Sequence, residues 1–185
     1  MKNILMAVIA LLTVSFKINK TSEIKTVRID KSKSSITYTM THPVHTWEGT
    51  CKEVDGVVQY DAKTSKIIKV AALAKIASFN SKNSNRDSHM LEVTDAIKYP
   101  SVSFVSTSVK DDGSTLDVTG KVTFHNVTKE IHFVATSKPE DNRRVLTGDF
   151  ILLLEDFNIE RPSFMLVKTE NKMKIDFNIG YAINA

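Results

Sequence analysis

The chain has 185 residues, of which 42% are hydrophobic, and its 25 Lys and Arg against 21 Asp and Glu leave a net charge of +4. This length fits one domain with a sizeable core and leaves little room for two. Because the basic residues are scattered rather than gathered into a stripe, the charge argues against nucleic-acid binding and favours a solvated outer face.

Residues 1–20 have the character of a targeting segment. Lys2 provides a positive charge, and the apolar stretch of residues 4–14 is shorter than the roughly 20 residues that a membrane span needs. We therefore expect a signal peptide over residues 1–20, with no well-defined cleavage site, and an exported domain over residues 21–185. That domain would be periplasmic or secreted and, once the signal is cleaved, would have no membrane span. An uncleaved anchor is the alternative.

Strand-like alternation dominates the chain after residue 26. Ile36, Tyr38 and Met40 alternate with threonines, and a longer alternating segment covers residues 172–183. Turn sequences at residues 61–66, 111–113 and 139–142 separate further alternating segments. About eight antiparallel strands result, and the expected fold is all-β, an eight-stranded antiparallel barrel. Such a barrel either packs solid or holds one small ligand.

On each of these strands the side chains at every second position are apolar, and these side chains are predicted to line the barrel. A filled core or a two-layer sandwich would produce the same alternation, so the pattern alone leaves a cavity open. Gly120 and Gly148 either leave room for a guest or relieve crowding at bends. The predicted lining residues are Ile36, Tyr38, Met40, Phe104, Val118, Val122, Phe124, Ile131, Phe133, Phe150, Leu152, Leu154, Ile175, Phe177, Ile179 and Tyr181.

Residues 80–100 do not alternate, and we expect a loop with a short helix that ends before Pro100 and lies over one mouth of the barrel. Arg86 in this segment can bind a phosphate or a carbonyl with its guanidinium. The alternative is an ion pair with Asp87 or Asp95 that only fixes the loop.

Metal, cofactor and catalytic sites are not indicated. His42 and His45 are three residues apart, so on a strand they point to opposite faces. Cys51 is the single cysteine, which excludes an intramolecular disulfide and favours a buried thiol. An enzyme that uses His42 or His89 as a base, with Cys51 or Tyr38 nearby, is a less favoured alternative, because no positioned partner for a base is evident.

Several short motifs occur in a specific order along the chain. They are Ile29-Asp30, Asp55-Gly56-Val57, Arg86-Asp87 with His89, Tyr99-Pro100, Gly120 to His125, Gly148-Asp149-Phe150 and Asp156 to Ile159. Their order and spacing resemble the YceI-like family. The resemblance implies an eight-stranded, extended lipocalin-like barrel that holds a polyisoprenoid or another long amphiphile and has no catalytic reaction. Residues 93–97 depart from the paired aromatic residues often found before the Tyr-Pro step, and Asn126 stands where glycine is usual.

Together these observations favour an exported protein that sequesters or carries a polyisoprenoid or similar amphiphilic lipid, with Arg86, His89 or His42 near the polar head group. A stress-response or interaction module with a filled core is the second hypothesis, and an enzyme acting on a bound hydrophobic substrate is the third. The partner is then a long-chain lipid and no nucleic acid. The sequence leaves open a homodimer and the identity of the lipid.

Overall fold

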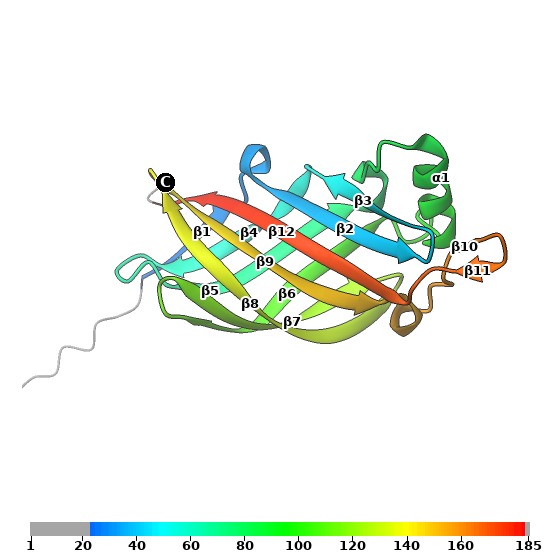
Figure 1. The fold of residues 1–185 in the computed structure, drawn as a ribbon. Helices are drawn as coiled ribbons and strands as arrows, with labels where there is room; N and C mark the ends of the chain where they lie inside the picture. The colour runs from blue at the N-terminus through cyan, green and yellow to red at the C-terminus, as the bar shows by residue number, and fades with distance from the viewer. Residues whose placement is uncertain (1–22, 184–185) are drawn as a thin grey trace, which may run out of the picture.

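A computed structural model describes residues 23–183, in which ten strands form one antiparallel sheet in the order β1-β4-β5-β6-β7-β8-β9-β12-β2-β3 (Figure 1). The predicted signal peptide, residues 1–20, lies entirely outside the described residues. The strands are β1 Ile24–Arg28, β2 Ser35–His42, β3 His45–Cys51, β4 Val54–Asp61, β5 Ile67–Lys75, β6 Ser101–Asp111, β7 Thr115–Phe124, β8 Val127–Glu140, β9 Arg143–Leu153 and β12 Lys172–Ala182.

The sheet curls on itself, and two isolated bridges tie its edge strands back. β12 extends beyond its pairing with β2, which stops at Asn178 opposite Ser35, so the end of β12 has a free edge. Ile29, just after β1, bridges to Tyr181 on that edge, and Thr50 of β3 bridges to Asn80. The all-β, antiparallel barrel architecture is therefore confirmed.

The expected number of eight strands is wrong, because β1 and β3 were not recognised. β1 is short and mixes charged with apolar residues. β3 follows Pro43 and carries Gly49 where an inward side chain would stand. The ring of Tyr38, the residue paired with Gly49, fills the space that a side chain at Gly49 would take. A glycine that accommodates a neighbouring ring weakens the alternation on which strand prediction depends.

The expected short helix is α1, Ser84–Val93, and it lies at one end of the barrel (Figure 1). Asn83 caps its N-terminus, where its side chain accepts a hydrogen bond from the backbone N–H of Arg86 at 3.1 Å. At the other end the Thr94 hydroxyl donates to the Met90 carbonyl at 2.7 Å. None of the helices in residues 23–183 has the length and hydropathy of a membrane span.

The long connection after β9 lies at the same end as α1. It comprises a 3-10 helix, η3 (Leu154–Phe157), and a small hairpin of β10 (Ser163–Phe164) and β11 (Val167–Lys168). Two further 3-10 helices are η1 (Lys31–Lys33) and η2 (Ile76–Ser78). We call the end that carries α1 and the β10–β11 hairpin the mouth, and the opposite end the base (Figure 1).

The base is closed by a buried arginine. The Arg144 guanidinium lies 3.4 Å from the Asp111 carboxylate, and these side chains are only 9% and 1% exposed. Asp111 also accepts a hydrogen bond from the backbone N–H of Ile67 at 2.8 Å. Both charges are thus paired and hydrogen-bonded, as burial demands. Arg144 donates further to the Ser137 hydroxyl and to the carbonyls of Ser65 and Gly113.

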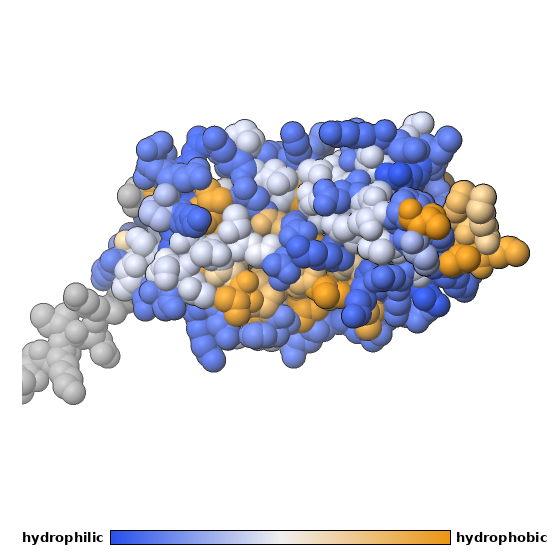
Figure 2. All heavy atoms as spheres, viewed as in Figure 1, coloured by the Kyte–Doolittle hydropathy of each residue, from blue (hydrophilic) through white to orange (hydrophobic). Residues whose placement is uncertain are grey.

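The wall of the barrel is incomplete between β8 and β9. Their pairing runs only from Glu140 opposite Arg143 to Ala135 opposite Gly148. Among the described residues, no strand pairs with the facing edges of residues 127–134 and 149–153. Val134 and Ile151 are 55% and 54% exposed on these segments, and apolar surface is visible on the wall over β8 and β9 (Figure 2).

Candidate functional site

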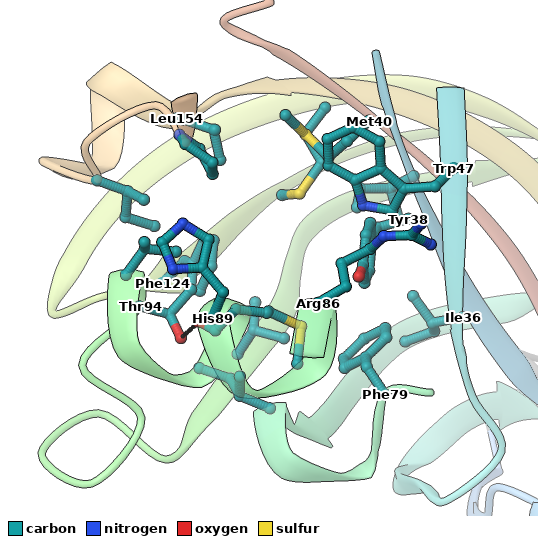
Figure 3. A pocket seen from close by; sticks show the side chains of 18 of the residues that line it. Ile36, Tyr38, Met40, Trp47, Phe79, Arg86, His89, Thr94, Phe124 and Leu154 are labelled. Carbon is teal, nitrogen blue, oxygen red and sulfur yellow. Dashed lines mark hydrogen bonds between the residues drawn. The ribbon is translucent and has the colours of Figure 1, made fainter. Parts of the chain in front are cut away.

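An apolar cavity of about 160 Å³ lies against α1 at the mouth (Figure 3). Its walls come from β2, β3, β6, β7, β9, β12, α1, the η2 segment and the connection after β9. The polar side chains in the lining are those of Tyr38, Trp47, Arg86, His89 and Thr94. The apolar residues are Ile36, Met40, Ile76, Phe79, Met90, Val93, Val102, Phe124, Phe150, Leu154, Ile159, Pro162, Met173 and Ile175.

A second cavity, of about 80 Å³, lies deeper in the barrel toward the base. It shares the lining residues Ile36, Phe150 and Ile175 with the mouth cavity. The interior is therefore neither solidly filled nor one open tube. Its other lining residues are Val70, Ala72, Phe104, Leu116, Val118, Phe133, Ala135, Leu146, Phe177 and Ile179.

Four phenylalanines form an aromatic cluster in the middle of the barrel. The ring centroid of Phe133 lies 5.3 Å from those of Phe150 and Phe177 and 5.6 Å from that of Phe104. A methyl group at Gly120 would overlap the Phe104 ring, and one at Gly148 would approach the Phe177 ring to 2.8 Å. The two glycines thus accommodate rings of this cluster, which is neither of the roles considered from the sequence.

Arg86 is the charged residue of the mouth cavity that the structure leaves without an acidic partner. Its guanidinium carbon lies 5.2 Å from the centroid of the Trp47 ring, in a cation–π contact (Figure 3). Within residues 23–183 no ion pair joins Arg86 to Asp87 or Asp95; Asp87 instead accepts a hydrogen bond from the backbone N–H of Ser81 at 3.0 Å. The alternative of a loop-fixing ion pair is therefore wrong, and the guanidinium donors are available to a ligand.

The two histidines predicted at the mouth differ in role. His89 lines the cavity from α1, and its Nδ1 lies 3.5 Å from the Glu92 carboxylate in an exposed pair. His42 is only 4% exposed and is not among the lining residues. Its Nε2 donates to the Val167 carbonyl at 3.0 Å, so it anchors the β10–β11 hairpin. A head-group role for His42 is thus contradicted by its position.

Most of the other predicted lining residues contact one of the two cavities. Ile36, Tyr38, Met40, Phe124, Phe150, Leu154 and Ile175 line the mouth cavity, and Phe104, Val118, Phe133, Phe177 and Ile179 line the deeper one. Their part in ligand binding stays a prediction. Four residues pack in the core beside the cavities instead of lining them: Val122, Ile131, Leu152 and Tyr181.

About half of the residues that line the mouth cavity were not predicted from the sequence. Val102 and Met173 have the same parity as the predicted Phe104 and Ile175, so extending the alternation by one step would have found both. Trp47 was missed together with β3. The residues from α1, η2 and the connection after β9 carry no period-two pattern.

Tyr38 and Cys51 are both shielded from water. Burial, with the nearby Asp87 carboxylate, raises the pKa of Tyr38, so its hydroxyl is neutral at ordinary pH. Cys51 has no exposed surface, and its Sγ lies 3.0 Å from the Ser78 hydroxyl. No cluster of three or more His, Cys, Asp or Glu side chains that could hold a metal ion occurs in residues 23–183.

The sequence of residues 27–181 matches the family model of the YceI-like domain. The chain belongs to the YceI-like family. Curated relatives are named UPF0312 proteins. One from Pseudomonas putida F1 is 33% identical over 160 residues, which cover 82% of this chain and 78% of the relative. Another, from Pseudomonas savastanoi pv. phaseolicola, is 36% identical over 143 residues, covering 72% and 71%.

Solved structures share the YceI-like fold at low sequence identity. BcnA of Burkholderia cenocepacia has a TM-score of 0.73 at 19% identity and covers 82% of this chain and 98% of its own. A polyisoprenoid binding domain from Saccharophagus degradans, implicated in plant cell wall breakdown, has a TM-score of 0.67 at 11% identity and covers 84% and 97%. The Campylobacter jejuni YCEI protein has a TM-score of 0.64 at 21% identity and covers 74% and 85%.

Proposed function

We propose that this YceI-like protein binds an amphiphile with an isoprenoid-like chain, whose chain enters the mouth cavity and whose head group stays near Arg86. The observation that carries the proposal is an almost entirely apolar cavity with a guanidinium at its rim that has no acidic partner among the described residues. The description of the Saccharophagus domain as polyisoprenoid binding supports it. We further propose that the protein is exported and acts in the periplasm or outside the cell.

The apolar lining provides the driving force. Each methylene group removed from water contributes about 0.8 kcal/mol, against which stands the cost of ordering the chain. An apolar cavity of about 150 Å³ holds one benzene-sized molecule, and the mouth cavity has a similar volume of about 160 Å³. It therefore takes roughly one isoprene unit without rearrangement.

A longer chain requires the deeper cavity. The way there passes Ile36, Phe150 and Ile175, which line both cavities. Phe150 also stacks on Phe133 with ring centroids 5.3 Å apart. We propose that the aromatic cluster shifts when a chain of several isoprene units enters, and that part of a still longer chain stays outside the mouth.

The head group is proposed to carry a phosphate or a carbonyl oxygen. A guanidinium offers paired N–H donors that fit either group. His89, also in the lining and half-exposed, can add a donor beside Arg86. No cofactor or metal is part of this proposal.

Native mass spectrometry of gently purified protein tests the proposal, followed by solvent extraction and identification of the released molecule. A stoichiometric adduct that yields an intact prenyl lipid is the expected result. A mass without adduct, unchanged after incubation with prenyl lipids, would contradict the proposal and favour an interaction module. A bound molecule that is chemically converted during incubation would favour an enzyme.

A further inference from the structure

The tip of the β10–β11 hairpin exposes four consecutive apolar side chains. Phe164, Met165, Leu166 and Val167 are 51%, 80%, 100% and 46% exposed. Their apolar surface stands out at the mouth end of the molecule (Figure 2). Single exposed apolar residues are ordinary, whereas a contiguous exposed group at a protruding tip marks a contact surface.

The backbone of this tip is unusual for the residues it carries. Met165 and Leu166 form the two-residue turn between Phe164 and Val167 and have φ values of 50° and 65°. Such a turn needs two left-handed residues, a position that Asn-Gly fills most readily and that bulky side chains disfavour. Because neither side chain is buried, packing inside this protein does not explain the choice of residues.

The tip is held in place beside the mouth cavity. Pro162, just before β10, lines the cavity, and the Val167 carbonyl accepts the hydrogen bond from His42. The Phe164 ring lies 6.0 Å and 6.3 Å from those of His42 and His45. Val44, 71% exposed in the turn between these histidines, adds a fifth apolar side chain. The exposed apolar tip is thus continuous with the rim of the cavity.

We propose that this tip, residues 164–167 together with Val44, docks on the surface of a lipid bilayer and inserts its side chains between the head groups. The inference rests on the proposed function, since a water-insoluble chain reaches the cavity most directly from a membrane that covers the mouth. None of the five side chains is charged or polar, and Lys168, which follows the tip, is paired with the Glu160 carboxylate at 3.5 Å. Apolar insertion at an interface fits this composition, whereas a specific protein partner would need polar groups to fix its orientation.

A dye that reports the polarity of its surroundings tests docking at individual labelled positions. The full chain with Leu166→Cys is labelled with nitrobenzoxadiazole and mixed with vesicles of pure phosphatidylcholine; Cys51 has no exposed surface and stays unlabelled in the folded protein. The matched control is Val134→Cys, an exposed apolar position on the barrel wall. We expect a blue shift and a rise in emission at position 166 only, insensitive to salt because the tip is uncharged.

A second variant separates docking from misfolding. Met165→Asn combined with Leu166→Gly installs the favoured turn residues, so the hairpin is expected to be at least as stable while its two most exposed apolar side chains are lost. We expect vesicle partitioning to fall by about tenfold or more relative to the wild type. The variant and the wild type differ only at residues 165 and 166, so any contribution of residues 1–22 to vesicle partitioning is the same in both proteins.

Binding of farnesol in the absence of vesicles distinguishes this inference from the proposed function. If the double variant binds farnesol as the wild type does but no longer partitions to vesicles, docking is supported. If neither protein binds farnesol while the dye at position 166 still reports insertion, the proposed function fails and docking stands. A dye response that needs no vesicles and grows with protein concentration indicates a second copy of the chain on the tip, and together with unchanged partitioning of the double variant it overturns the inference.

Discussion

Arg144 at the base and Arg86 at the mouth occupy opposite ends of one barrel and have opposite surroundings. Arg144 is buried, faces the Asp111 carboxylate and donates to the Ser137 hydroxyl of β8 and to the carbonyls of two turns. Arg86 is half-buried, lies over the Trp47 ring, and has no carboxylate partner among the described residues. Protein oxygen atoms satisfy the guanidinium at the base, whereas the guanidinium at the mouth has no carboxylate partner among the described residues. This difference fits the proposal that the base holds the fold and the mouth binds the ligand.

The largest expected effect concerns the base. Arg144→Met leaves the Asp111 charge buried without a partner, so we expect the free energy of unfolding to fall by about 3–5 kcal/mol. Arg143→Met is the control, because Arg143 pairs with Asp30 at 3.0 Å in a more exposed position and its loss costs about 1 kcal/mol or less. Denaturant unfolding measures both. Equal losses would mean that the base is not held by the buried pair.

Removing the centre of the aromatic cluster is expected to have the next largest effect. Phe133→Ala loses contacts with three rings, and we expect a cost of about 3 kcal/mol. The same change enlarges the deeper cavity, so chains of several isoprene units should bind more tightly relative to short ones. Val134→Ala, at the exposed neighbouring position, should change stability by about 0.5 kcal/mol or less. If Phe133→Ala binds short and long chains with the same preference as the wild type, the aromatic cluster does not separate the two cavities.

Alkaline pH should weaken the base through Tyr181. Burial raises the pKa of Tyr181 from its ordinary 10.0 to about 12, an effect that the Arg144 guanidinium only partly opposes. Because the folded state favours the neutral phenol, this contribution is complete below pH 10 and is lost as the pH rises toward 12. Between these values the wild type should lose about 2 kcal/mol more than Tyr181→Phe. Parallel pH profiles of the two proteins, measured by denaturant unfolding, would contradict this.

The smallest expected effect concerns the mouth and leaves the fold unchanged. Arg86→Gln should weaken binding of farnesyl phosphate by about tenfold, or about 1.4 kcal/mol, and leave binding of farnesol unchanged. Its stability should stay within about 0.5 kcal/mol of the wild type. Arg161→Gln is the control, because Arg161 pairs with Glu155 at 2.9 Å and does not line the cavity. Equal loss for both ligands would remove the head-group role of Arg86.

Much of the barrel was predictable because period-two alternation reports which side chains face inward. Phe104, Phe133 and Phe177 were assigned to the interior on that basis, and all three line the deeper cavity. Alternation says nothing of which rings meet in the centre. The division of the interior into two cavities depends on side-chain packing between strands distant in sequence, so it could not be predicted.

The mouth was less predictable because its contacts join segments far apart in the chain. The alternation of β2 predicted that His42 points inward, like Met40. It could not predict that the carbonyl of Val167, 125 residues later in the sequence, accepts a hydrogen bond from the His42 ring. Arg86 was identified from its segment, whereas its contact Trp47 lies on a strand that weak alternation concealed. Helix and loop residues of the lining follow no pattern that distinguishes a cavity from an ordinary core.

The most direct test uses Trp47, the single tryptophan of the chain, which lies in the lining of the mouth cavity. Its fluorescence is titrated with farnesyl phosphate in the wild type, in Val102→Phe, which fills the cavity, and in Val105→Phe, on the exposed face of the same strand. The account predicts a saturable change of one-to-one stoichiometry in the wild type and in Val105→Phe, and its loss in Val102→Phe. An unaltered titration in Val102→Phe, or none in the wild type, would contradict ligand binding in the mouth cavity.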